Sequence, residues 1–198
     1  MNAPTLHALA TAGATPSARS AARYPTELID VWLSRHGERM TMRPVLAQDE
    51  PGLRALYRRS STAVRDVADN FPDLLDGIGD VAFAHELAVV VSVDLGGSQR
   101  IVADARYVVA ASAASADFAV LVEDGWRRQG LGRRALDALV DGARRAGLKS
   151  LRSTVERTNA PMLLLLHRCG FAAATDGAAA TTSLVTMARD VAAVGLDI

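Results

Sequence analysis

Runs of apolar residues divide this chain into a strand-rich middle and a second half in which helices alternate with strands. Residues 85–94 and 100–110 form apolar runs on either side of Gly96-Gly97, and a third run covers residues 117–122. β-Branched residues favour strands, and a pair of glycines suits a tight hairpin turn. The pattern therefore predicts three consecutive strands that pair as an antiparallel meander.

Ahead of the meander, the pattern predicts a hairpin and then a helix. Residues 28–33 and 39–43 have the composition of strands and flank a turn at His36-Gly37. An acidic residue followed by an early proline at residues 49–51 indicates the start of a helix. Residues 60–80 are predicted to form irregular helix. The apolar residues that the first helix would bury are Leu53, Leu56 and Tyr57.

Residues 123–132 join the last meander strand to a helix whose apolar stripe ends at Gly147. The first turn of a helix has unpaired backbone N–H groups and the positive end of the helix dipole, and these stabilise a phosphate group. Gly130 and Gly132 would let the backbone approach such a group closely. The sequence therefore predicts a pyrophosphate-binding loop. The arginines that would supply charge there are Arg127, Arg128 and Arg133.

Beyond this helix, the pattern predicts a strand at residues 150–155 and a second helix. An asparagine is a favoured helix cap, so the second helix is predicted to begin after Asn159 and to end at Gly170. Its segment 162–166 is apolar on all sides, which predicts that it is buried. Residues 181–187 are the last predicted strand.

Composition narrows the classes of partner and compartment. The chain has 22 basic and 22 acidic residues, so no excess of charge indicates nucleic acid or an anionic membrane as a partner. No apolar run approaches the length that spans a bilayer. The single cysteine, Cys169, fits a reducing cytoplasm, and its position is typical of a small buried residue. Residues 1–23 lack acidic residues and apolar periodicity, which predicts a disordered tail before a domain at residues 24–198.

Several motifs together resemble the GNAT superfamily of N-acetyltransferases. The arginine and glycine motif at residues 127–132 is similar to the coenzyme A signature of that family, with Asn159 and Gly170-Phe171 downstream. Residues 116–122 are similar to the central strand of bacterial protein lysine acetyltransferases. The resemblance implies an α/β (α+β) fold, in which helices flank a mixed, mostly antiparallel sheet. It also implies a V-shaped splay between the two strands that hold the cofactor.

The resemblance further implies that acetyl-CoA is the cosubstrate and that no metal is involved. The central strand would hydrogen-bond to the pantetheine arm, and the loop would hold the pyrophosphate. Asn159 would contact the pantetheine or the leaving end of the cofactor. The implied cofactor-binding residues are Val120, Leu121, Val122, Arg127, Arg128, Gln129, Gly130, Leu131, Gly132, Arg133 and Asn159.

The implied reaction is direct transfer of the acetyl group to a primary amine, without a covalent enzyme intermediate. A lysine amine has an ordinary pKa of about 10.4 and arrives protonated, so a base must remove its proton. The candidate catalytic residues are Asp117, where the lysine-acetylating subgroup usually has glutamate, and Glu123. Glu156 is a further carboxylate in reach. A free strand N–H near Val120 or Leu121 would stabilise the developing oxyanion.

The residues are compatible with more than one acceptor and more than one oligomeric state. The favoured acceptor is a protein lysine, and the alternative acceptor is a small-molecule amine. The protein could be a monomer or a homodimer. Many superfamily members have a tyrosine that can protonate the leaving thiolate at the position of Leu166, and its absence leaves a non-catalytic coenzyme A-binding regulator as another alternative. Residues 130–135 also match a dinucleotide-binding fingerprint, although folds with that fingerprint open on this unit and use parallel strands.

Overall fold

A computed structural model describes residues 24–60, 85–110, 114–174 and 183–192 of the chain. The predicted tail at 1–23 and the predicted irregular helix beyond residue 60 lie outside the described residues. The strands are β1 (Asp30–Leu33), β2 (Arg39–Pro44), β3 (Glu86–Leu95), β4 (Ser98–Val109), β5 (Ser115–Val122), β6 (Ser150–Glu156), β7 (Ala172–Ala173) and β8 (Leu184–Asp190). The α-helices are α1 (Glu50–Arg59), α3 (Leu131–Arg145) and α4 (Ala160–Arg168), and three-residue 3-10 turns include η1 (Thr26–Leu28), η2 (Ala47–Asp49) and η4 (Asp124–Trp126).

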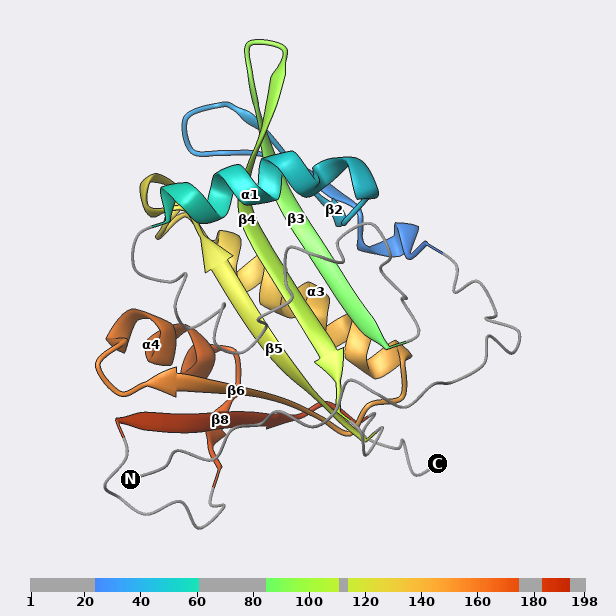
Figure 1. The fold of residues 1–198 in the computed structure, drawn as a ribbon, viewed down its shortest axis with the longest axis vertical. Coiled ribbons are helices and arrows are strands. Elements are labelled where there is room, and N and C mark those ends of the chain that lie inside the picture. The colour runs from blue at the N-terminus through green and yellow to red at the C-terminus, as the bar shows by residue number, and fades with distance from the viewer. Residues whose placement is uncertain (1–23, 61–84, 111–113, 175–182, 193–198) are drawn as a thin grey trace, which may run out of the picture.

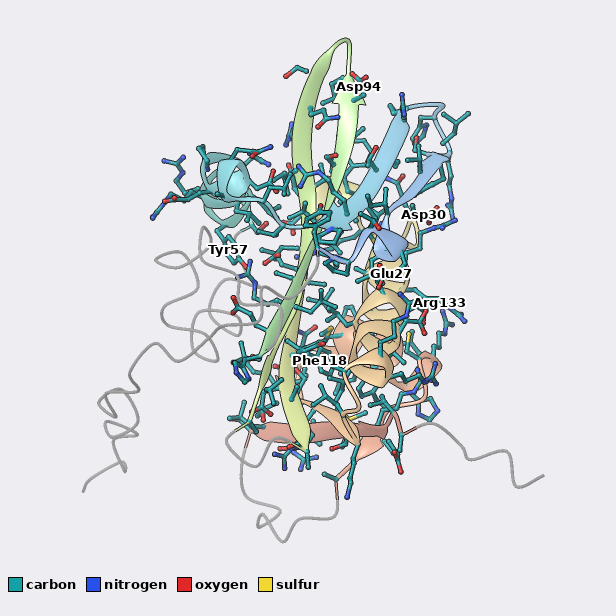
Figure 2. All side chains as sticks on the ribbon, turned by 90° about the vertical axis from the view of Figure 1, so that its right-hand side faces the viewer. Glu27, Asp30, Tyr57, Asp94, Phe118 and Arg133 are labelled. Carbon is teal, nitrogen blue, oxygen red and sulfur yellow. The ribbon has the colours of Figure 1, made fainter. Side chains whose placement is uncertain are left out.

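One sheet of eight strands, in the order β1-β2-β3-β4-β5-β6-β8-β7, organises the described residues. Helix α1 crosses one face of this sheet, called the front face below, and α3 packs on the other, the back face (Figure 1). Figure 2 shows the sheet nearly edge-on between these two helices. All pairings are antiparallel except that of β5 with β6. The predicted fold class, a mixed and mostly antiparallel sheet flanked by helices, is confirmed.

The predicted meander is confirmed, and its register fixes which side chains share a face. Strands β3, β4 and β5 pair without interruption except for one shift in register between Val91 and Ser92. The pairing of β4 with β5 places Asp104 opposite Leu121 and Val108 opposite Asp117. The predicted hairpin also forms, but its first strand begins at Asp30, because the preceding residues form the turn η1.

The turn η1 and the hairpin of β1 and β2 are attached to α3 by charged contacts. Arg134 on α3 pairs with Asp30 at 2.8 Å, and its guanidinium lies 4.6 Å from the ring centroid of Trp32. Arg145 pairs with Glu27 at 3.0 Å, near the other end of the helix. Glu27 and Asp30 accordingly lie on the α3 side of the sheet (Figure 2).

The splay that the family resemblance implies is present between β5 and β6. These two strands are parallel neighbours, but their register ends at the pair of Asp117 with Arg152. Beyond that pair β5 continues to Val122 on its β4 side only, while β6 continues to Glu156 beside β8. The two strands therefore diverge after three paired positions, and one edge of β5 is left without a neighbouring strand in the described part of the chain.

The prediction that residues 162–166 are buried on all sides is wrong. Within α4 only Leu166 is fully buried, and Leu164 keeps 50% of its surface exposed. The reason is geometric: α4 has nine residues and contacts the core with one face. Apolar residues on every face of the helix therefore did not mean that every face packs against other residues.

A close approach of α3 to the sheet depends on Gly142. A Cβ atom at this position would overlap the buried Cδ2 of Leu87 and would lie 3.8 Å from Cε1 of Tyr107. Glycine in a helix normally costs about 1 kcal/mol relative to alanine. Here the smaller residue lets the helix pack directly on β3 and β4.

We predict that Gly142→Ala lowers the free energy of unfolding by about 1 to 3 kcal/mol, because overpacking a core outweighs the gain in helix propensity. Urea unfolding followed by circular dichroism would measure it. The penalty should shrink in a Leu87→Val background, where Cδ2 is absent. An equal penalty in both backgrounds would show that this contact is not its cause.

Candidate active site

The free edge of β5 carries backbone groups whose direction follows from the pairing with β4. Ala110 donates its N–H to Ser115, and Glu123 donates its N–H to Val102. Hydrogen-bonded pairs alternate along an antiparallel ladder. The N–H of Leu121 therefore bonds within the sheet.

The same alternation turns the N–H and C=O groups of Val120 and Val122 toward the gap between β5 and β6. This gap is called the slot below. Of the two residues expected to stabilise an oxyanion, Val120 has the geometry for it. Leu121 contributes only its side chain, which is buried on the front face.

The predicted pyrophosphate loop leads from the end of β5 into α3. Arg128 has a φ of 60° and Gly130 a φ of 86°, so the backbone turns twice through the left-handed region just before the helix. The two glycines serve different needs. Gly130 has open space around it and is favoured by its φ, whereas a Cβ at Gly132 would lie 3.1 Å from Leu165 of α4. Gly132 thus permits contact between the two helices.

The first turn of α3 fits an anionic group. It has no acidic residue, and no side chain caps it. The first hydrogen bond of this turn runs from the N–H of Arg134 to the carbonyl of Gly130. The N–H groups of Leu131, Gly132 and Arg133 are therefore directed outward, together with the positive end of the dipole. Gln129 precedes them in the loop and is half-buried.

Arg127 connects the loop to the slot. Its Nε donates to the carbonyl oxygen of Val122 at 3.1 Å, and its Nη2 pairs with Asp124 at 2.6 Å. The carbonyl that it holds is one of those that face the slot. Arg127 therefore lies where the free edge of β5 meets the helix N-terminus.

Asn159 is confirmed as the cap of α4, because its side chain accepts a hydrogen bond from the N–H of Met162 at 3.3 Å. Glu156 is the last residue of β6, and Asn159 follows it by three residues. Asn159 therefore lies on the β6 side of the slot, opposite β5. A role in binding the cofactor remains a prediction.

The carboxylates of the site differ in their surroundings. Asp117 is exposed on the front face, at the point where β5 and β6 part. Glu123 is only 8% exposed and forms ion pairs with Arg59, at 3.2 Å, and with Arg100. Two guanidinium groups hold its carboxylate in place. Glu156 is exposed at the end of β6. The geometry therefore favours Asp117 over Glu123 as a base.

A buried polar cluster on the front face was not predicted from the sequence. Asp104, 2% exposed, accepts hydrogen bonds from Arg106 through both carboxylate oxygens at 3.0 Å. The hydroxyl of Tyr57 on α1 donates to the same carboxylate at 2.6 Å. Burial and the neighbouring carboxylate raise the pKa of Tyr57, so it remains a donor. The cluster ties α1 to β4 directly beside Leu121.

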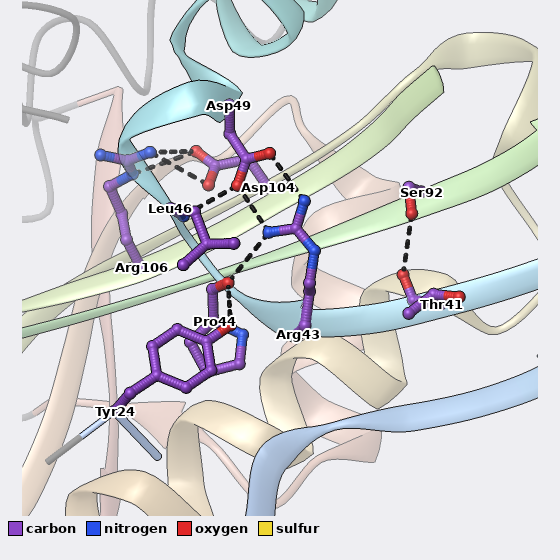
Figure 3. A network of polar contacts seen from close by, with 9 residues as sticks. All are labelled: Tyr24, Thr41, Arg43, Pro44, Leu46, Asp49, Ser92, Asp104 and Arg106. Carbon is purple, nitrogen blue, oxygen red and sulfur yellow. Dashed lines mark hydrogen bonds and ion pairs between the residues drawn. The ribbon is translucent and has the colours of Figure 1, made fainter. Parts of the chain in front are cut away.

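A second carboxylate holds the chain that leads into α1. Arg43 donates to both oxygens of Asp49, at 2.6 and 2.7 Å, and the N–H of Leu46 donates to Asp49 at 2.8 Å. The hydroxyl of Tyr24 donates to the carbonyl of Pro44 at 2.9 Å. Figure 3 shows these contacts beside the pair of Asp104 with Arg106.

Residues at the end of α4 pack into the back-face core. Leu166 is completely buried, and Cys169 is buried in the same core as Phe171, whose ring lies 5.0 Å from that of Phe118. Burial raises the pKa of the Cys169 thiol, which makes it a poor nucleophile. The prediction that Cys169 is a small buried residue is confirmed.

Comparison with known proteins identifies the family. A model described as the acetyltransferase (GNAT) family matches residues 69–171, more than half of the chain. The chain belongs to this family. It is therefore an acyltransferase, as expected, and acetyl-CoA as the expected cosubstrate agrees with the family and with the fit of the slot and loop.

Individual relatives agree with this assignment. An acetyltransferase of Pseudomonas aeruginosa is 27% identical over 146 residues, which cover 71% of this chain and 78% of that one. The GNAT domain of S. lividans PAT has a TM-score of 0.69 at 19% identity, covering 85% of this chain and 99% of that one. The Salmonella typhimurium protein yncA, solved with its cofactor acetyl-CoA, has a TM-score of 0.60 at 18% identity and covers 79% and 96%.

The fold excludes the dinucleotide-binding alternative. Folds with that fingerprint place it after the first strand of a parallel sheet, whereas this loop follows β5, the last strand of an antiparallel meander. Within the described ranges, no group of three or more histidine, cysteine or acidic side chains is arranged to hold a metal ion. None of the helices described here has both the length and the apolar character needed to cross a membrane.

We predict that Arg127→Gln weakens coenzyme A binding about tenfold, through loss of a positive charge beside the helix N-terminus. Isothermal titration calorimetry would measure the dissociation constant. Arg144→Gln is the matched control, because Arg144 is exposed near the other end of α3 and pairs only with Asp141 among the described residues. Equal affinity in both variants would contradict a role for Arg127.

We also predict that Tyr57→Phe lowers the free energy of unfolding by about 1 to 3 kcal/mol, since a buried carboxylate loses a donor. Tyr107→Phe should change it little, because Tyr107 is buried without a hydrogen bond from its hydroxyl to any described residue. Thermal or urea unfolding of both variants would compare them. An unchanged free energy of unfolding in Tyr57→Phe would show that its hydrogen bond to Asp104 contributes little stability.

Proposed function

We propose that this protein transfers the acetyl group of acetyl-CoA to a lysine side chain of a protein. The single observation that carries the proposal is the free edge of β5, which leads directly to an arginine-rich helix N-terminus. An extended pantetheine arm can add to such an edge as a further strand does, with its pyrophosphate at the start of α3. A small primary amine is the alternative acceptor.

The two faces of the slot support different routes for cosubstrate and acceptor. On the back face, α4 contacts α3 near Gly132, and Phe118 packs on Phe171. The helix N-terminus that would bind the pyrophosphate lies on this side. On the front face, α1 contacts β4, and no described helix covers β6 or β8. The acceptor amine is therefore proposed to enter from the front.

The backbone would stabilise the transition state. The N–H of Val120 faces the slot, where it can donate to the oxygen of the thioester carbonyl as negative charge develops there. The amine nitrogen bonds to the carbonyl carbon, the carbon–sulfur bond breaks, and the electron pair leaves with the sulfur. A thiol has an ordinary pKa of about 8.5, so the thiolate can leave and then take a proton from water. This route needs no acidic side chain at position 166, where the chain has leucine in place of the tyrosine of many superfamily members.

Asp117 is the proposed base. It lies three residues before Val120, which corresponds to about 10 Å along a strand, so a water molecule must relay the proton from the amine. Its exposed carboxylate has room for that water. Glu123 lies equally far from Val120, three residues after it, but its two ion pairs hold it in place.

A protein lysine is favoured over a small amine for two reasons. Residues 116–122 resemble the central strand of bacterial protein lysine acetyltransferases. The front of β6 and β8 is also uncovered by any described helix, which leaves space for a polypeptide. The balanced composition and the single cysteine are consistent with the proposed cytoplasmic location.

We predict that Asp117→Asn lowers kcat about 100-fold with a lysine peptide, since general-base catalysis contributes at least this much. The affinity for acetyl-CoA should not change. Thiol release would report turnover, and Glu156→Gln, which removes an exposed carboxylate from the end of β6, is the control. Full activity in Asp117→Asn together with its loss in Glu123→Gln would reassign the base to Glu123.

A further inference from the structure

Arg152 occupies the point where the slot begins. It is the last residue of β6 that pairs with β5, and its partner in register is Asp117. Neighbours in register on parallel strands have side chains on the same face of the sheet. Leu151 belongs to the back-face core, so Arg152 and Asp117 both lie on the front face, where we propose that the acceptor enters.

The guanidinium of Arg152 makes few polar contacts with the described residues. Its Nη2 donates to the hydroxyl of Ser115 at 3.2 Å, while its Nε is buried and has no hydrogen-bond partner. Among the described residues, no carboxylate lies within ion-pair distance of it. A buried donor without an acceptor costs free energy, and arginine is suited to bind a carboxylate through two parallel hydrogen bonds. Within the described ranges, the guanidinium as a whole therefore has no anionic partner.

The neighbouring charges on the front face do not supply one. Asp117 is adjacent but exposed, and no ion pair joins it to Arg152. Asp104 is saturated by Arg106 and Tyr57. Glu156 lies four residues farther along β6, where it accepts a hydrogen bond from Thr158 at 3.2 Å. Among the described residues of the front face, none therefore supplies an anionic partner for Arg152.

We propose that Arg152 binds a carboxylate of the acceptor, so that the enzyme prefers a lysine with an acidic residue beside it in the sequence. This inference rests on the proposed function. The thioester would lie near Val120, about 10 Å from Arg152 along the strand. A lysine side chain spans part of this separation, and a neighbouring residue, at about 3.5 Å of main chain, spans the rest. The amine then lies at the slot while the acidic side chain reaches Arg152.

The test uses three peptides that each contain one lysine, flanked on both sides by Glu, Gln or Arg. Wild-type protein should acetylate the Glu peptide with a kcat/KM about 10-fold above that of the Gln peptide, as expected for a charge-assisted contact, and added salt should reduce this ratio. Arg152→Gln should acetylate the Glu and Gln peptides with the same kcat/KM. Arg152→Glu should prefer the Arg peptide.

Two controls separate the possible causes. Arg144→Gln removes one positive charge at a distance from the slot and should retain the preference for the Glu peptide. The affinity for acetyl-CoA should be the same in all four proteins, which shows that each variant is folded and that its slot is intact. Equal kcat/KM for the three peptides with wild-type protein, or an unchanged preference in Arg152→Gln, would overturn the proposal.

Failure of the proposed function would give a different result. If wild-type protein binds acetyl-CoA but acetylates none of the peptides, protein lysine is not the acceptor. Free lysine and cadaverine then replace the peptides, because they differ by a single carboxylate. A preference for lysine that disappears in Arg152→Gln would support the role of Arg152, and the lack of any such preference would refute it.

Discussion

The divergence of β5 from β6 is the constraint on which the rest of this structure depends. An unpaired strand edge normally invites association with other chains. Here the edge lies inside the sheet, with helices packed behind it. Its backbone groups at Val120 and Val122 are held in a fixed direction by the pairing of β5 with β4. The protein thus has preorganised donors and acceptors whose direction suits an extended ligand.

Two packing features keep those groups in place. Gly142 lets α3 lie directly on β3 and β4, and the cluster of Tyr57, Asp104 and Arg106 ties α1 to the opposite face of β4. Both act on β4, whose register decides which groups of β5 face the slot. A slip of one residue would exchange Leu121 for Val120 and turn every side chain of β5 to the other face.

The sequence predicted the features that depend on local pattern. The meander, the loop with its helix, and the cap at Asn159 all follow from periodicity or from the chemistry of single residues. The direction of the Val120 N–H was not predictable, because it depends on pairing with a strand more than ten residues away. The Asp104 cluster was missed because two charged residues within an apolar run give no periodic signal. The exposure of Leu164 was missed because composition does not reveal which faces of a helix have neighbours.

Amide hydrogen exchange measured by NMR tests the central claim most directly, since it reports each backbone N–H of β5 separately. In the free protein, the amide of Leu121 should be protected by its bond to β4, while the amides of Val120 and Val122 exchange faster. Acetyl-CoA should then slow exchange at Val120 and Val122 and leave Leu121 unchanged. Fast exchange at Leu121 in the free protein, with protection gained there and not at Val120 on addition of acetyl-CoA, would contradict the account.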